Sequence, residues 1–148
     1  MSCYAAVGDA AGMRRSAELA LKRCEAVLAH VQNNSGVIGY SVYALAVLGD
    51  GERAKARMNR ALLVDPDNFN MRYNFACALC QQLKDKEAAL KMLESVFASI
   101  SEEFLPYAKA DPDLDSLHDD PRYQAMVDAA EARLAAARTA VEPANLTA

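Results

Sequence analysis

Apolar residues recur at one fixed interval along the middle of the chain. The matching pairs, each 34 residues apart, are Leu45 and Leu79, Ala54 and Ala88, and Met58 and Met92, and the same step backwards reaches Ala20 and Cys24. A period of this length is typical of a helix–turn–helix unit whose apolar face is buried only when several units stack. The repeat therefore predicts an all-α array of stacked helical pairs.

Turn residues set the borders of these units. Gly49-Asp50-Gly51 stops one helix, and the proline of Asp65-Pro66 ends the next, because proline lacks the amide hydrogen that a continuing helix needs. In the second unit Leu83 stands where a turn glycine is expected. We predict a partial first unit over residues 1–34, complete units over 35–68 and 69–102, a connecting segment with a capping helix over 103–141, and a flexible tail over 142–148.

In the partial first unit, one helix can be predicted from the sequence. Gly8-Asp9 resembles the turn at Gly49-Asp50, and a helix is predicted from about Met13 to Val31. Its expected apolar stripe consists of Leu19, Ala20, Cys24, Val27, Leu28 and Val31.

In the complete units, each helix has a predicted buried face. The first helices carry Ile38, Val42, Leu45 and Ala46, then Phe75, Ala76 and Leu79; the second helices carry Ala54, Met58, Ala61 and Leu62, then Ala88, Met92, Ser95 and Val96. Ala54 and Ala88 are expected where the two helices of a unit approach most closely. A larger side chain there should cost about 1–3 kcal/mol through overpacking.

The C-terminal segment contains two Asp-Pro pairs, at Asp111-Pro112 and Asp120-Pro121, which favour turns or helix starts. A last helix over about Pro121–Val141 is predicted to cover the final apolar surface of the array. Its expected inward face consists of Tyr123, Met126, Val127, Ala130, Leu134, Ala137 and Val141.

Composition narrows the class of protein. A net charge of −4 and a pI near 5.2 leave no basic stripe for nucleic acid, and no apolar run is long enough to cross a bilayer. The N-terminus lacks the pattern of a signal peptide. Four unevenly spaced cysteines indicate reduced thiols rather than a disulfide framework, so a cytoplasmic protein without membrane contact is expected.

These residues together resemble the tetratricopeptide repeat (TPR) family, which implies a right-handed superhelix of helical pairs with a C-terminal capping helix. Gly49-Asp50, Ala54, Ala61, Asp65-Pro66, Asn74 and Glu87-Ala88 match the family pattern, whereas Arg72, Leu83 and Ile100 depart from it. The segments 73–78, 111–117 and 119–123 are similar to the C-terminal repeat region of bacterial class III adenylate or guanylate cyclases and related multidomain signalling proteins. That resemblance implies a regulatory module of, or a stand-alone relative of, such a protein.

By this resemblance the first helix of each unit faces a concave groove that binds a protein or peptide. The groove residues so implied are Tyr40, Tyr43, Asn70, Tyr73, Asn74, Cys77 and Gln81. Amides and phenols can bond a peptide backbone while aromatic rings grip its side chains. The alternative is that the last helix or the segment Phe104–Tyr107 fills the groove. Gly39 and Tyr43 occupy positions where a carboxylate clamp would need Lys and Asn, which argues against a chaperone-binding role.

Other candidate sites have simpler interpretations. Cys77 and Cys80 have the spacing of a zinc or redox half-site but no second ligand pair nearby, and Asp111, Asp113 and Asp115 imitate the start of a calcium loop without its later ligands. His30 and His118 have no partners for a catalytic triad. We therefore expect no enzyme activity, cofactor or metal. Homo-oligomerisation is the main alternative to peptide binding, ahead of a metal-binding or enzymatic role.

Overall fold

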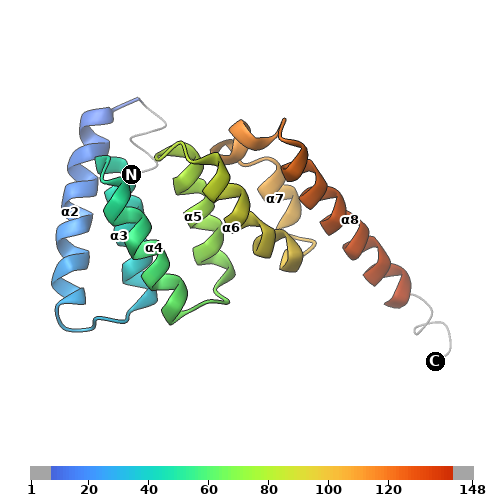
Figure 1. Ribbon diagram of the computed structural model, residues 1–148, viewed down its shortest axis with the longest axis horizontal. Helices are drawn as coiled ribbons and strands as arrows, with labels where there is room; N and C mark the ends of the chain where they lie inside the picture. Colours follow the sequence, from blue (N-terminus) through green and yellow to red (C-terminus); the bar gives the residue numbers. More distant parts are fainter. Residues whose placement is uncertain (1–7, 142–148) are drawn as a thin grey trace.

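The computed structural model describes residues 8–141, which form seven α-helices and one 3₁₀ helix and no strand (Figure 1). The elements are α2 (Ala10–Leu28), α3 (Ser35–Leu48), α4 (Gly51–Val64), α5 (Phe69–Gln81), α6 (Lys86–Ser99), α7 (Leu105–Lys109), η1 (Pro112–Leu117) and α8 (Pro121–Val141). The predicted all-α class is confirmed. The tail expected over 142–148 and the first seven residues lie outside the described part of the chain.

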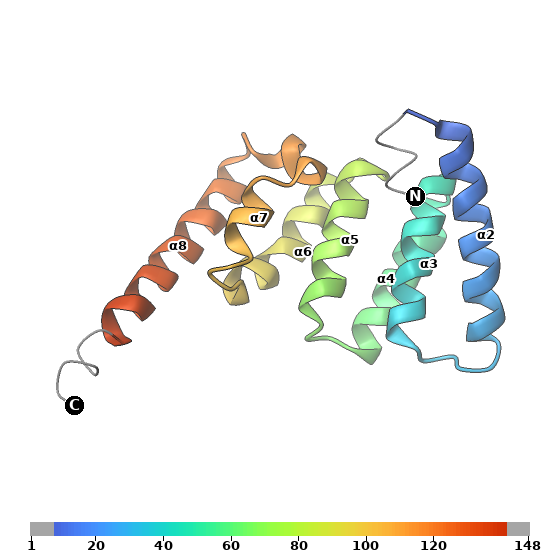
Figure 2. The same cartoon turned by 180° about the vertical axis from the view of Figure 1, so that it is seen from behind.

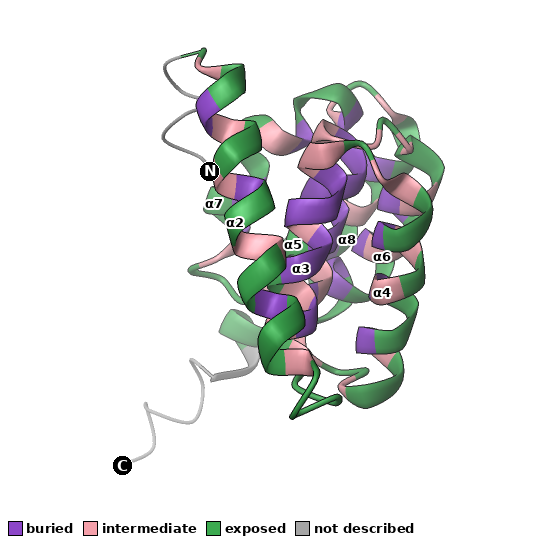
Figure 3. Ribbon diagram, turned by 90° about the vertical axis from the view of Figure 1, so that its left-hand side faces the viewer, coloured by how far each residue is buried: buried purple, intermediate pink, exposed green. Residues whose placement is uncertain are grey.

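The helices stand in a row from α2 to α8, with α8 slanting away from the rest (Figures 1 and 2). α3 packs on α4 and α5 on α6, and in each pair a short turn makes the two helices antiparallel. α3 and α5 also pack on each other and run in the same direction, while α2 covers α3 and α8 covers α6. Viewed along the row, α4 and α6 lie on one side of α3 and α5, and α7 lies on the other side (Figure 3).

Side-chain caps start these helices at intervals close to the sequence repeat. The side-chain oxygens of Asn34 and Asn68 accept hydrogen bonds from the amides of Val37 and Met71, at 3.0 and 2.9 Å. Asp50 and Asp85 cap α4 and α6 in the same way. Each such cap is worth about 1 kcal/mol, because it satisfies an amide that otherwise has no partner in the helix.

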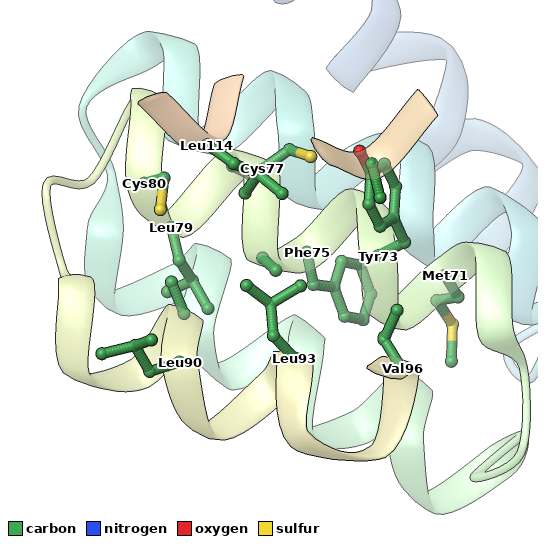
Figure 4. Close-up of a cluster of buried hydrophobic side chains, with 14 of the residues drawn as sticks. Met71, Tyr73, Phe75, Cys77, Leu79, Cys80, Leu90, Leu93, Val96 and Leu114 are labelled. Carbon is green, nitrogen blue, oxygen red and sulfur yellow. The ribbon is translucent and has the colours of Figure 1, made fainter. Parts of the chain in front are cut away.

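The core is continuous from α3 to α8, and its centre lies between α5 and α6. Leu93 of α6 lies beside Phe75 and Leu79 of α5, and all three side chains are at most 2% exposed (Figure 4). The predicted buried faces of α3, α4 and α5 are confirmed, apart from Leu62, which is only partly buried.

The predicted register of α6 is wrong by one residue. Ala89, and not Ala88, is the fully buried alanine equivalent to Ala54, and Leu93 rather than Met92 matches Met58. The reason is one extra residue in the α5–α6 turn: the amide of Asp50 bonds the carbonyl of Leu45, whereas that of Asp85 reaches one residue further back. Ser95, which had been expected to face inwards, is exposed, whereas Val96 is buried as predicted.

The left-handed residue of the second turn is Lys84, with φ 54°, which takes the place of Gly49, with φ 82°. Leu83, the residue that stands one repeat after Gly49, instead packs partly against the core. The repeat is therefore 34 residues between first helices and 35 between second helices.

The first described helix also differs from its prediction. α2 begins at Ala10, directly after the capping residue Asp9, and ends at Leu28, three residues before Val31. Three members of the expected stripe, Leu19, Val27 and Val31, are 43–54% exposed. Cys24 is buried and Leu28 is partly covered, as predicted, but Ala17 and Leu21 also face inwards, so the predicted stripe is only partly correct.

The C-terminal helix has its predicted bounds, and Pro112 and Pro121 begin η1 and α8 as expected. Tyr123, Val127 and Ala130 are buried against the array, and Met126 and Leu134 are partly buried. Ala137, however, is exposed, because the second half of α8 extends past α6; the side chain of Val141 is outside the described part. No described helix is long and apolar enough to cross a membrane.

Candidate functional site

The floor of the candidate site is formed by the faces of α3 and α5 that point away from α4 and α6. On α3 the spacing of Gly36, Gly39, Tyr40 and Tyr43 places these residues on one side, opposite the buried Ile38, Val42 and Leu45. On α5 the corresponding residues are Asn70, Asn74 and Cys77. Two helices running in the same direction thus present their outward residues to a single hollow.

A wall beside this floor comes from α7 and η1, which fold back and pack beside α5. The ring of Tyr73 meets Phe104 edge to face, with centroids 5.0 Å apart and planes at 86°, and lies 6.2 Å from the ring of Tyr107. Phe104 also meets Phe69 edge to face at 5.2 Å. Such pairs add about 0.5–1.5 kcal/mol beyond the area they bury, so they hold this wall in place.

Together these elements enclose an open pocket of about 530 Å³, which we call the α3–α5 groove. It is lined by Ser35, Gly36, Gly39, Tyr40, Tyr43, Asn68, Asn70, Met71, Tyr73, Asn74, Phe75, Cys77, Tyr107, Asp111 and Asp113. The lining is a mixture of aromatic rings, amides and two carboxylates. A volume of this size suits a small ligand or one or two side chains of a peptide.

The buried carboxylate of Asp111 organises the wall nearest α5. Its Oδ2 accepts a 2.6 Å hydrogen bond from the hydroxyl of Tyr73, and its Oδ1 accepts the amide of Asp113 at 2.9 Å. The thiol sulfur of Cys77 lies 4.0 Å from the same Oδ2. Asp111 therefore caps η1 and attaches it to the middle of α5.

Burial controls the protonation of the groups around Asp111. It raises the pKa of Tyr73 and of Cys77 well above their ordinary values, and the nearby carboxylate adds to both effects. Burial also raises the pKa of Asp113, with a further contribution from the charge of Asp111. At neutral pH the phenol and the thiol thus stay protonated and act as donors, and the thiol is a poor nucleophile.

Six of the seven groove residues named from the sequence line the α3–α5 groove. Tyr40 is 73% exposed, and Asn70 and Asn74 are also exposed, so their polar groups face solvent. Tyr43 is partly buried. Tyr73 and Cys77 are almost fully buried and direct their polar atoms towards Asp111.

The seventh, Gln81, does not line the groove. Its amide nitrogen donates to the carbonyl oxygen of Pro112 at 3.4 Å. η1 covers the end of α5 at this point, so Gln81 holds η1 rather than facing the hollow. The role of Gln81 is therefore to support the fold.

The groove residues named from the sequence all lie on α3 and α5, and they lack the three that the C-terminal segment contributes: Tyr107, Asp111 and Asp113. The two aspartates had been interpreted only as turn and cap residues, and Asp111 does have that role. The alternative in which Phe104–Tyr107 fills the groove holds in part, because Phe104 covers Tyr73 while the hollow over Gly39 and Asn74 stays open. The only sequence signal for Asp111 and Asp113 as groove residues is that their two carboxylates stand directly before and after Pro112.

The other candidate sites are dispersed in the structure. Cys77 and Cys80 are buried in the second half of α5 and are free. Asp115 is exposed and lies 3.7 Å from Nδ1 of His118, whereas His30 is at the exposed end of α2. Within residues 8–141, no three His, Cys, Asp or Glu side chains lie together as metal ligands would.

Comparison with known proteins gives no relative from which a function could be transferred: no protein-family model, no curated protein and no solved structure matches the chain.

Proposed function

We propose that this protein is a non-catalytic interaction module that binds an extended peptide segment in the α3–α5 groove. The observation that carries the proposal is the open groove itself, with the exposed ring of Tyr40 at one side and the exposed amides of Asn70 and Asn74 at the other. No hydrogen bond to another described residue engages these two amide side chains. They are therefore free to bond the backbone of a bound chain.

The helical arrangement supports the finer proposal of a TPR-type superhelix. Each of the two hairpins pairs a first helix, α3 or α5, with a second helix, α4 or α6, and the first helices pack on each other. The caps Asn34 and Asn68 repeat at the TPR interval. The further role as a regulatory module of a bacterial signalling protein rests on the sequence resemblance alone.

Gly39 provides a sharp test of groove binding. A Cβ built on this glycine meets only Met71 Cγ and Phe75 Cε1, both at 4.0 Å, so a larger side chain enters open groove without displacing the core. Gly39→Leu should also favour α3 by up to about 1 kcal/mol, because glycine is a poor helix former. The variant should fill the groove while leaving the fold intact.

The experiment selects short random peptides displayed on phage against the wild-type protein and measures synthetic hits by fluorescence polarisation. Gly39→Leu should abolish binding, whereas Asn59→Leu, on the exposed side of α4 outside the groove, should not. Thermal melts of all three proteins establish that the variants are folded. If no selected peptide distinguishes Gly39→Leu from Asn59→Leu, the groove is not the binding surface.

Self-association is a second candidate function, and one observation favours it. Leu105, Pro106, Leu134 and Ala135 form an apolar hollow between α7 and the protruding half of α8. Its borders carry the ion pairs Lys109–Glu131 and Arg138–Glu102. Light-scattering mass at two concentrations tests this directly: a stable dimer that Leu134→Asp dissociates supports it, and a concentration-independent monomer rejects it.

A further inference from the structure

The α3–α5 groove has a marked charge asymmetry. Of its lining residues, only Asp111 and Asp113 carry charge, and no lysine or arginine is among them. Some other carboxylates of the array have basic partners; Asp85 pairs with Lys55 at 2.6 Å, and Glu87 pairs with Arg122 at 2.7 Å. Within the described chain, by contrast, neither Asp111 nor Asp113 forms an ion pair. Two neighbouring acidic groups thus face the hollow with no basic partner from this chain.

The carboxylates of Asp111 and Asp113 differ in the hydrogen bonds that they already accept and in their exposure. Both oxygens of Asp111 already accept hydrogen bonds, one from Tyr73 and one from the amide of Asp113. The side chain of Asp113, by contrast, is partly exposed and lines the hollow. Burial and the charge of Asp111 raise the pKa of Asp113, as expected for a partly buried carboxylate that forms no ion pair. Asp113 is therefore the carboxylate that an incoming cation can reach.

Aromatic rings surround this acidic end. Tyr43 of α3 and the 59% exposed Tyr107 line the same hollow as Asp111 and Asp113. Burial, and then the charge of Asp113, raise the pKa of the Tyr43 phenol. The faces of tyrosine rings attract ammonium and guanidinium groups, particularly where water is partly excluded. Rings and carboxylates at one end of a hollow favour an organic cation with an apolar stem.

We infer that the α3–α5 groove anchors its peptide through a lysine or arginine side chain, whose charged head contacts Asp113 between Tyr43 and Tyr107. This inference rests on the proposed function. The stem of the basic side chain packs over Gly39 and Phe75, and the peptide backbone continues towards Asn70 and Asn74. A protein segment fits this arrangement better than a free amine, because the exposed amides extend the polar lining beyond the acidic end.

The test uses the displayed random peptides and the wild-type protein. Selected peptides should be enriched in Lys or Arg at one position, and replacing that residue by norleucine or citrulline in the synthetic peptide should weaken binding about tenfold. Asp113→Asn removes the charge with little change in shape and should weaken binding of the basic peptide by a similar factor. The matched control, Asp128→Asn, removes an exposed charge on α8 and should leave the affinity unchanged. Asp113→Lys should reverse the preference towards Glu or Asp at the same position.

The outcomes separate the inference from the function on which it rests. Peptides that lose binding to Gly39→Leu but show no basic preference, or that bind Asp113→Asn as tightly as wild type, overturn the inference and leave the groove proposal standing. An affinity that falls equally in Asp113→Asn and Asp128→Asn reflects net charge only and also overturns the inference. A selection without any groove-dependent peptide overturns both.

Discussion

The hydroxyl of Tyr73 and the carboxylate of Asp111 form a buried hydrogen bond of 2.6 Å between the middle of α5 and the residue that caps η1. The two residues are 4% and 8% exposed. Because the same carboxylate accepts the amide of Asp113, it fixes both the start of η1 and the distance of η1 from α5. This contact therefore determines how much of the α3–α5 groove the C-terminal segment covers.

Removing the donor of this bond should destabilise the protein. Tyr73→Phe keeps the ring packing on Phe104 but leaves Asp111 Oδ2 buried without its strongest donor, which should lower the free energy of unfolding by about 1–3 kcal/mol. Urea denaturation measures the change. Tyr107→Phe is the matched control, because Tyr107 is 59% exposed and its loss of a hydroxyl should change the free energy of unfolding by less than about 0.5 kcal/mol. Equal effects of the two substitutions would show that the bond contributes nothing specific.

The register of α6 gives a second prediction. Ala89 is fully buried, whereas the neighbouring Ala88 is only partly buried. Ala89→Leu should therefore lower the free energy of unfolding by about 1–3 kcal/mol through overpacking, and Ala54→Leu should behave in the same way. Ala88→Leu should cost less, and Lys91→Ala, on the exposed side of α6, should have little effect. A thermal melt of each variant checks the order, and a larger loss at Ala88 than at Ala89 would contradict the observed register.

The error at Ala88 shows what the sequence could and could not determine. The 34-residue step fixes the first helices correctly, because Leu45 and Leu79 are both fully buried. In the second helix Ala88 and Ala89 are identical in type, so the sequence offers two equally small residues for one site. The choice depends on the length of the turn before α6, and that turn has no glycine to mark it. A left-handed lysine gives no recognisable signal.

The candidate site, too, could be predicted from the sequence only in part. The outward faces of α3 and α5 are a local property, and six of the residues that the TPR resemblance implied on these faces line the α3–α5 groove. The wall formed by α7 and η1 depends on the contacts of Phe104 and Asp111 with Tyr73. Tyr73 lies about 30 to 40 residues earlier in the chain, and no periodicity specifies these contacts. Exposed apolar residues such as Val27 are likewise not separable from core residues by pattern alone.

Lys84 offers a stabilising substitution. Its φ of 54° lies in the left-handed region, which costs a side chain with a Cβ about 1 kcal/mol more than glycine. Lys84→Gly should therefore raise the thermal midpoint, in part offset by the larger entropy of the unfolded chain. Gly49→Ala should lower it, because Gly49 has φ 82° although nothing lies within 4 Å of its added Cβ. A melt in which Lys84→Gly is clearly less stable than wild type would show that the lysine side chain has a compensating contact.

Alkaline pH should weaken the fold through its buried phenols. Burial raises the pKa of Tyr73 and raises that of Tyr123 to about 12, so both groups hold their protons in the folded state when an unfolded tyrosine, with a pKa of about 10, has lost its own. The unfolded chain then binds fewer protons than the folded chain, and the free energy of unfolding falls as pH rises, by up to about 1.4 kcal/mol per pH unit for each such group. Below about pH 10 the buried phenols cause no loss of stability. Burial also raises the pKa of Cys77, so the same loss of stability begins about one pH unit lower for this thiol.

Urea denaturation at intervals from about pH 8 to about pH 11 measures this slope. Tyr73→Phe should reduce the slope, because it removes one of the titrating groups, even though it lowers stability at every pH. Tyr40→Phe should keep the wild-type slope, since the Tyr40 side chain is 73% exposed. A wild-type free energy of unfolding that stays constant over this range would mean that Tyr73 and Tyr123 reach water in the folded protein, and the buried contact of Tyr73 with Asp111 would then be open.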